Sequence, residues 1–156
     1  MPSWISSARE NRFPNLTRDT YEKKSDESGR YNCIAFAVGD TERWWEPPID
    51  GTLDPGQYWP KGAPTDYHVN SYVKAYELHG FELYNEEIKG FGFETVALYA
   101  HRDGEITHAA RLNEYGSWNS KLGDWEDIRH DYLIGLEGER PAYGYVRFFM
   151  RRIHPQ

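Results

Sequence analysis

Residues 94–122 read ETVALYAHRDGEITHAARLNEYGSWNSKL. Three segments rich in aliphatic and aromatic residues alternate here with two short polar turns, the first of which contains Asp103-Gly104. A turn of this composition joins neighbouring antiparallel strands, because it accepts the backbone that a tight hairpin requires. The stretch therefore predicts an antiparallel meander. With two further segments of strand composition, the predicted strands are 81–84, 94–100, 106–112, 117–122 and 143–152.

Two helices are predicted before the meander. The apolar run CIAFAV at 33–38 follows Asn32, a favourable N-cap residue, and is predicted as a short buried helix that extends as far as Trp45 in one interpretation. A buried strand is the alternative for so short a run. Residues 69–76 have apolar side chains at helical spacing, with Thr65 as the cap. Helices followed by antiparallel strands indicate an α+β fold.

The remaining segments set the domain organisation. Residues 46–64 contain five prolines and three glycines and are predicted as a long loop, a feature that often forms a lid or a binding surface. Residues 1–30 are predicted as an irregular N-terminal arm. Residues 31–156 are predicted as a single compact α+β domain, in which the helices pack on an antiparallel meander or half-barrel.

Composition excludes several classes of function. The 156 residues carry a net charge of -7, with a pI of about 5.4 and a mean hydropathy of -0.85. An acidic chain is a poor nucleic-acid binder, and no apolar run approaches the ~20 residues of a membrane helix. Cys33 is the only cysteine, which excludes an internal disulfide and a cysteine-rich zinc site. No His-x-x-x-His spacing occurs, so neither a metal nor a cofactor is expected.

Location is predicted from the N-terminus. Met1 to Asn15 contain no apolar segment of the kind found in secretory signals. The expected location is therefore the cytoplasm, or outside the cell by export without a classical signal peptide.

Cys33 is the candidate nucleophile. At the first turn of a helix, the thiolate is stabilised by the positive end of the helix dipole and by unpaired backbone N–H groups. The Cys33 N–H itself supplies half of an oxyanion hole. The alternative is a small buried apolar residue without chemistry.

His108 and Asn119 are the candidate partners of this cysteine. His108 shares a strand face with Ala110, whose small side chain leaves room for a group to approach the ring. Asn119 is expected on the neighbouring strand, where it would accept from the imidazole N–H and fix the tautomer. The alternatives are a structural histidine and a solvent-facing asparagine.

Further residues are candidates for substrate binding. Lys121 would counter an acidic substrate group, or would pair with Glu126 or Asp127. His130 would support the site, or would make a local hydrogen bond. Aromatic residues beside the proline-rich loop would stack on sugar or peptide, or would pin the loop to the core. These aromatic candidates are Trp44, Trp45, Tyr58 and Trp59.

The order of cysteine, histidine and polar residue resembles that of papain-like enzymes, most of all the NlpC-type and CHAP-type amidases and peptidases. Those proteins carry a polar residue before the cysteine, as Asn32 precedes Cys33 here, although Ile34-Ala35 replace their usual Ser-Gly. More closely, the chain resembles an uncharacterised bacterial family of domains of unknown function. The matching segments are FPNL (13–16), YNCIAFA (31–37), RWW (43–45), YWP (58–60), HAAR (108–111) and WNSKLG (118–123) with His130.

This resemblance implies a compact papain-like fold and a thiol hydrolase or acyltransferase that acts on amide bonds. Cys33 would attack the carbonyl, His108 would move the proton, Asn119 would orient the imidazole and Asn32 would assist the oxyanion. The implied partner is a peptide, glycopeptide or acyl-amide substrate, with no nucleic acid and no membrane. The alternative is an inactive papain-like module that binds peptide or glycan, for example in a toxin or defence system.

Overall fold

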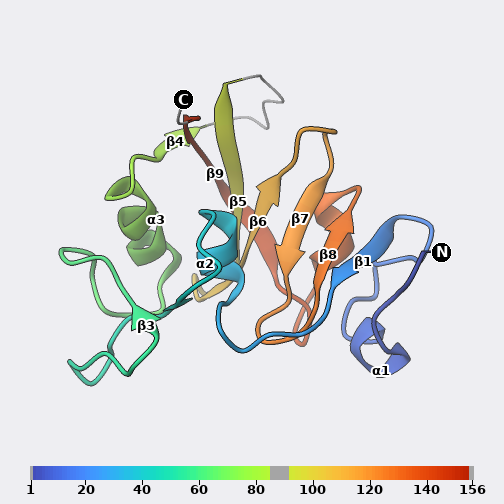
Figure 1. Cartoon of the computed structure of the whole chain (residues 1–156), viewed down its shortest axis with the longest axis horizontal. Coiled ribbons are helices and arrows are strands. Elements are labelled where there is room, and N and C mark those ends of the chain that lie inside the picture. The colour runs from blue at the N-terminus through green and yellow to red at the C-terminus, as the bar shows by residue number, and fades with distance from the viewer. Residues whose placement is uncertain (1, 85–91, 155–156) are drawn as a thin grey trace.

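A seven-stranded antiparallel sheet forms the centre of the computed structural model, which describes residues 2–84 and 92–154 (Figure 1). The strand order is β1-β8-β7-β6-β5-β9-β4, so β5 to β7 form the predicted meander, β8 extends it by a strand that the sequence did not predict, and β9 lies between β5 and β4. Within the described residues the sheet has two edges and does not close into a barrel. Its strands are β1 (Tyr21–Ser25), β4 (Glu82–Tyr84), β5 (Phe93–Ala100), β6 (Ile106–Leu112), β7 (Trp118–Lys121), β8 (Asp127–His130) and β9 (Tyr145–Ile153).

Short helices and a small parallel sheet surround this centre. They are α1 (Ser7–Glu10), α2 (Cys33–Ala37), α3 (Val69–Glu77), the 3-10 helix η1 (Leu133–Leu136) and the parallel pair β2 (Trp44–Trp45) and β3 (Gln57–Tyr58). The fold is therefore α+β, as the sequence predicts. None of the helices in residues 2–84 and 92–154 is both long enough and apolar enough to cross a membrane.

Both predicted helices form, with two corrections at their ends. The proposed extension to Trp45 is wrong, because α2 ends at Ala37 and Gly39 then adopts a left-handed backbone with φ 88°. Thr65 is not the cap of α3, because His68 takes that place and its Nδ1 accepts from the Asn70 N–H at 3.1 Å.

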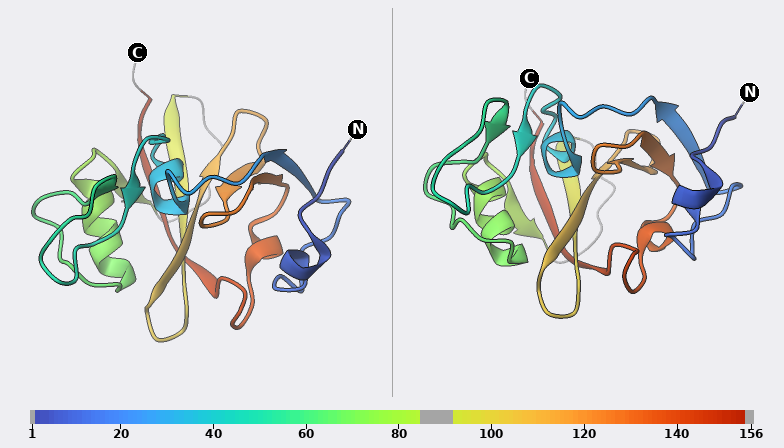
Figure 2. Two further views of the ribbon diagram at one scale, coloured as in Figure 1. Left: turned by 60° about the horizontal axis from the view of Figure 1, so that its bottom comes forward. Right: turned by 90° about the horizontal axis from the view of Figure 1, so that it is seen from below.

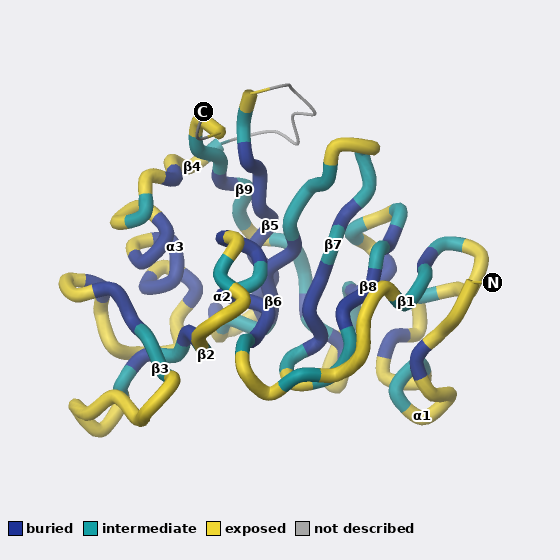
Figure 3. The backbone as a smooth tube through the Cα atoms, in the orientation of Figure 1, coloured by how far each residue is buried: buried dark blue, intermediate teal, exposed yellow. Residues whose placement is uncertain are grey.

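Two apolar clusters lie on opposite faces of the sheet. On one face, α2 packs across β6 and β7 and α3 packs near β4 and β5. On the other face, the N-terminal arm and η1 cover the sheet, and Asn15 Nδ2 donates to the Glu137 carbonyl at 3.1 Å (Figure 2). Buried backbone runs through β5, β6 and α3 (Figure 3). The sheet is therefore covered on both faces at its centre, where β6 lies.

The N-terminal arm is more ordered than the sequence predicts. Residues 21–25 form the edge strand β1, in which Tyr21 lies opposite His130 of β8. Tyr21 is the only fully buried residue of β1, since an edge strand with one exposed face has few apolar positions. Because residues 22–30 are polar, the sequence did not predict the strand that begins at Tyr21.

Candidate functional site

Cys33 is the first residue of α2, as predicted. Asn32 caps the helix, because its Oδ1 accepts from the Ala35 N–H at 3.1 Å. The same oxygen accepts from the Trp45 N–H at 3.2 Å, and Asn32 Nδ2 donates to the Trp45 carbonyl at 2.8 Å. The Asn32 side chain therefore holds α2 to β2, and in this structure these bonds occupy the group expected to assist an oxyanion.

The Cys33 thiol lies just below the surface, with 8% of the residue exposed. Burial raises the pKa of the thiol to about 11, which outweighs the opposite effect of the nearby Ala109 and Ile34 N–H groups and of the Lys121 charge. The thiol is therefore neutral in the free protein at physiological pH. The electropositive surroundings of the helix start are present, but they do not ionise the sulfur by themselves.

The site lies where β6 and β7 separate. In the described chain these strands pair at Arg111 opposite Asn119 and at Leu112 opposite Trp118, at the end of β6 far from His108. Toward His108 the two strands open, and the Ala109 N–H faces the Cys33 sulfur there. His108 reaches β7 from the other face of the sheet, where its Nε2 lies 2.8 Å from Ser120 Oγ.

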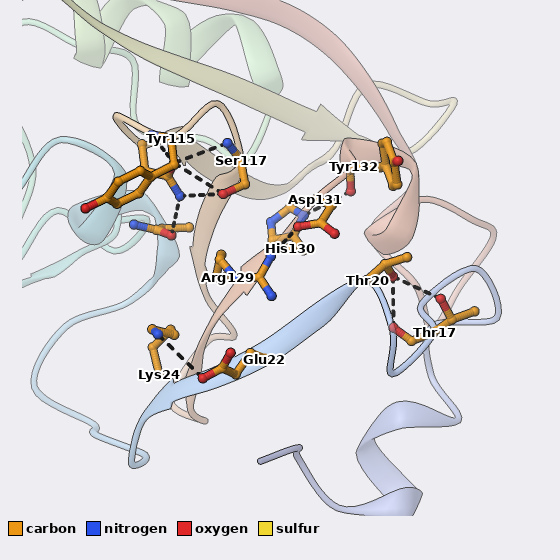
Figure 4. A network of polar contacts seen from close by, with 12 residues as sticks. Thr17, Thr20, Glu22, Lys24, Tyr115, Ser117, Arg129, His130, Asp131 and Tyr132 are labelled. Carbon is orange, nitrogen blue, oxygen red and sulfur yellow. Dashed lines mark hydrogen bonds and ion pairs between the residues drawn. The ribbon is translucent and has the colours of Figure 1, made fainter. Parts of the chain in front are cut away.

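His108 belongs to a chain of buried hydrogen bonds. Its Nε2 lies 2.8 Å from Ser120 Oγ, which lies 2.8 Å from His130 Nε2. His130 Nδ1 lies 3.0 Å from the Tyr132 carbonyl; His130 ends β8 and Tyr132 follows it closely (Figure 4). All three side chains, those of His108, Ser120 and His130, are buried.

The donors and acceptors along this series of hydrogen bonds follow from the Tyr132 carbonyl at its end. A carbonyl only accepts, so His130 Nδ1 donates to Tyr132 and His130 Nε2 is left as an acceptor. Burial lowers the pKa of His130 to about 4, and burial, with the neighbouring His130 as a second cause, lowers the pKa of His108 well below its usual value, so both rings are neutral at physiological pH. Ser120 then donates to His130 and accepts from His108 Nε2–H. His108 Nδ1 therefore carries a lone pair.

This lone pair has no hydrogen-bond partner among the described residues, although the atom is buried. The ring is fixed on both sides: Tyr143 stacks on it at 4.4 Å with an interplanar angle of 9°, and Tyr99 meets it edge-on at 5.3 Å. Buried polar atoms are almost always bonded, so an unpaired nitrogen in a rigidly held ring needs a reason. Burial also lowers the pKa of the ring, so this nitrogen stays unprotonated in the free protein.

No hydrogen bond joins His108 to Cys33 among the described residues, because the imidazole and the thiol lie on opposite faces of the sheet. Ala109 lies in the α2-facing cluster with Cys33, whereas His108 contacts Tyr99 and Tyr143 on the other side. Catalytic hydrogen bonds are often long in free enzymes and shorten when substrate binds.

Asn119 does not contact His108. Its register opposite Arg111 places it on the α2 face, where its Oδ1 accepts from Asn113 Nδ2 at 3.1 Å. The predicted Asn119–His108 hydrogen bond is wrong, and Ser120 occupies that place. The error is one of strand parity, because neighbouring residues of β7 point to opposite faces. Because side chains alternate between the two faces along a strand, the pairing of β6 with β7 would have identified Ser120 as the residue on the His108 face.

Two of the aromatic candidates are core residues. Trp45 is 1% exposed and its Nε1 donates to Asp40 Oδ2 at 2.9 Å, and Trp59 packs edge-on against Tyr72 at 4.8 Å. Trp44 and Tyr58 are half-buried. Trp44 Nε1 donates to Glu46 Oε1 at 3.3 Å, and the Tyr58 hydroxyl pairs with His79 Nε2 at 2.9 Å. In this structure the aromatic residues pin the proline-rich loop to the core.

Lys121 and His130 are both buried. Lys121 has no exposed surface, and its Nζ donates to the carbonyls of Ser28 at 2.7 Å and Gly123 at 2.6 Å, not to Glu126 or Asp127. His130 supports His108 through Ser120. No group of three or more histidine, cysteine or acidic side chains in residues 2–84 and 92–154 is placed to hold a metal ion.

Ser120→Ala tests the hydrogen-bond chain. The change leaves His108 Nε2–H and His130 Nε2 buried without partners, at about 1–3 kcal/mol for each group. We expect the free energy of unfolding, measured by urea denaturation, to fall by about 2–4 kcal/mol. Ser3→Ala, at an exposed position, is the matched control and should change it by less than about 0.5 kcal/mol. Equal stabilities of the two variants would show that the chain of bonds does not exist.

Comparison with known proteins gives one match. The model of a family described as a domain of unknown function, DUF7689, covers residues 22–151. No curated protein and no solved structure matches the chain. The match extends from β1 through most of β9 and so includes every residue of the site described above.

Proposed function

Because the chain belongs to DUF7689, whose activity is undefined, the site must supply the function, and we propose a papain-like thiol hydrolase or acyltransferase acting on amide bonds. One observation carries this proposal: the unpaired, buried Nδ1 of His108. Ser120 and His130 fix the tautomer so that the lone pair is on this nitrogen. The thiol of Cys33 lies at a helix start, and the N–H of Ala109, the residue after His108, faces its sulfur.

The reaction would use these groups in sequence. The Cys33 S–H proton moves to His108 Nδ1 as the sulfur bonds to the substrate carbonyl carbon and the carbonyl π electrons move to oxygen. The C–N bond then breaks, the amine takes the proton from His108 and a thioester remains on Cys33. Water, or an acceptor amine, attacks the thioester with its proton passing to His108, and the thiol is regenerated.

The energetics favour proton transfer during the attack over a preformed ion pair. Burial raises the pKa of Cys33 to about 11 and lowers the pKa of His108 well below its ordinary value, so thiolate and imidazolium do not form together in the free protein. The proton therefore has to leave the sulfur as the sulfur bonds to the carbonyl carbon.

Acyl transfer to Cys33 tests the proposal. We expect p-nitrophenyl esters and p-nitroanilides of short acyl groups or amino acids to acylate the wild-type protein, with nitrophenol or nitroaniline release. Intact-mass and peptide mapping should place the acyl group on Cys33. An adduct on lysine alone, or no adduct with any member of the panel, contradicts the proposal.

A binding module is the second candidate, because the thiol is neutral and makes no hydrogen bond to His108 among the described residues. In that case, peptides or glycans would bind saturably by calorimetry without turnover, and Cys33→Ala would leave the affinity unchanged. Acylation of Cys33 would show that the protein is more than a binding module.

A further inference from the structure

Lys121 is a buried cation in the immediate surroundings of the candidate nucleophile. It is the last residue of β7 and has no exposed surface. Lysine is almost never fully buried unless its charge is compensated. The position of the ammonium group therefore calls for an explanation in terms of its neighbours.

Lys121 points toward α2, the helix that Cys33 begins. Arg111 donates to a carbonyl of α2 and lies opposite Asn119, so Asn119 is on the α2 face of β7. Lys121 is two residues further along the same strand and therefore faces α2 as well, and α2 packs on β6 and β7. Cys33 is the residue of α2 whose sulfur faces the Ala109 N–H. The thiol thus has a backbone donor from β6 and an ammonium group from β7.

The contacts of Nζ leave its charge largely uncompensated. Two donors go to the carbonyls of Ser28 and Gly123, and the face of Tyr31 lies 5.0 Å from Nζ, all of which suit an ammonium group. Among the described residues no acidic side chain forms an ion pair with Nζ: Asp124 is exposed, Glu126 pairs with Arg9 at 2.7 Å, and Asp127 accepts from the Ser25 hydroxyl.

We propose that the ammonium group of Lys121, not the imidazolium of His108, is the fixed positive charge that stabilises the Cys33 thiolate during the reaction. This inference rests on the proposed thiol chemistry. It gives the two groups separate tasks: His108 accepts the proton, and Lys121 holds the negative charge on sulfur. A water-free setting makes such a charge more effective than it would be in solvent.

The electrostatics of the site agree with this division. Burial lowers the pKa of Lys121, and Cys33 is the strongest of the neighbouring groups that raise it. Lys121 in turn lowers the pKa of the thiol. Apart from His108, the proposed base, the ionisable groups that act on the pair are acids. They are Asp124, Glu126 and Asp127 around Lys121, and the phenols Tyr72, Tyr76 and Tyr143 around Cys33.

Lys121→Met, Lys121→Arg and the exposed control Lys61→Met test the proposal. The pKa of Cys33 is read from thiolate absorbance at 240 nm and from iodoacetamide rates between pH 7 and 11. We expect Lys121→Met to raise this pKa by about one unit, a tenfold loss of thiolate at a given pH. Lys121→Arg should restore it, and Lys61→Met should leave it at the wild-type value. An unchanged pKa in folded Lys121→Met overturns the proposal.

A reciprocal measurement covers the case in which Lys121→Met does not fold. The Lys121 ammonium group is titrated by NMR in wild type and in Cys33→Ala. Because coupling between two sites is mutual, removing the thiol should lower the pKa of Lys121 by a similar amount. Identical titrations reject the proposal. Neither readout requires turnover, so coupling without acylation would refute the proposed enzyme alone, and acylation without coupling would refute the role of Lys121 alone.

Discussion

Replacing Cys33 with alanine is expected to abolish amide or ester turnover while leaving the fold intact. The groups of a nucleophilic site act as a unit, so losing the nucleophile lowers the rate by several powers of ten. The substitution removes one sulfur atom at the edge of the core, at a cost near or below ~1–2 kcal/mol of unfolding free energy. Initial rates for wild type and variant, with circular dichroism and urea denaturation, measure the two effects.

Val38→Ala is the matched control for this variant. Val38 is also 8% exposed, lies directly after α2 and takes no part in the proposed chemistry. It should lose some stability and keep its turnover. Equal turnover in wild type and Cys33→Ala would show that Cys33 is a structural residue.

Mild acid is expected to destabilise the protein through its buried histidines. The pKa of His130 is about 4 in the folded chain, whereas an unfolded histidine has a pKa near 6.5. Between these values the unfolded chain binds a proton that the folded chain does not. The stabilising contribution is therefore complete above about pH 6.5 and is lost as the pH falls toward 4. His130 alone accounts for on the order of 3 kcal/mol, and His108 acts in the same direction.

Urea denaturation at several pH values from 7.5 to 4.5 measures this loss. Most carboxylates titrate below this pH range and therefore contribute little to the change. In His130→Gln the side-chain amide can still accept from Ser120 and donate to Tyr132, and the slope in this window should become markedly shallower. His154→Gln, at an exposed position, should keep the wild-type slope. A wild-type unfolding free energy that stays constant from pH 6.5 to 4.5 would contradict neutral, buried rings.

Local signals allowed the prediction of α2 and β6. Asn32 before an apolar run gives the start of α2, and residues 106–112 form β6 with the predicted bounds. The short edge strand β1 and the two-residue strands β2 and β3 could not be predicted in this way, because their stability comes from partners distant in sequence. Local patterns describe a strand well only when its own residues form one apolar face.

At the site, the sequence singled out Cys33, His108 and His130; the structure joins His108 to His130 through Ser120 and places Cys33 on the α2 side of the sheet. It did not identify Ser120, because choosing between Asn119 and Ser120 requires the register between β6 and β7. It offered an acidic substrate group, Glu126 or Asp127 as the partner of Lys121, and it missed the carbonyl that holds the ammonium group, which comes from a segment 93 residues away. Contacts with residues so distant in sequence cannot be predicted from local composition.

The pairing of β1 with β8 has a consequence for synthesis on the ribosome. Ser25 and its partner Asp127 are 102 residues apart in the chain. At ~5–20 residues per second, the ribosome needs roughly 5–20 s to make the strand that completes β1. During this time β1 is a nascent segment without its partner, exposed to other chains. Its charged residues Glu22, Lys23 and Lys24 discourage such chains from pairing with it, so the arm remains available until β8 emerges.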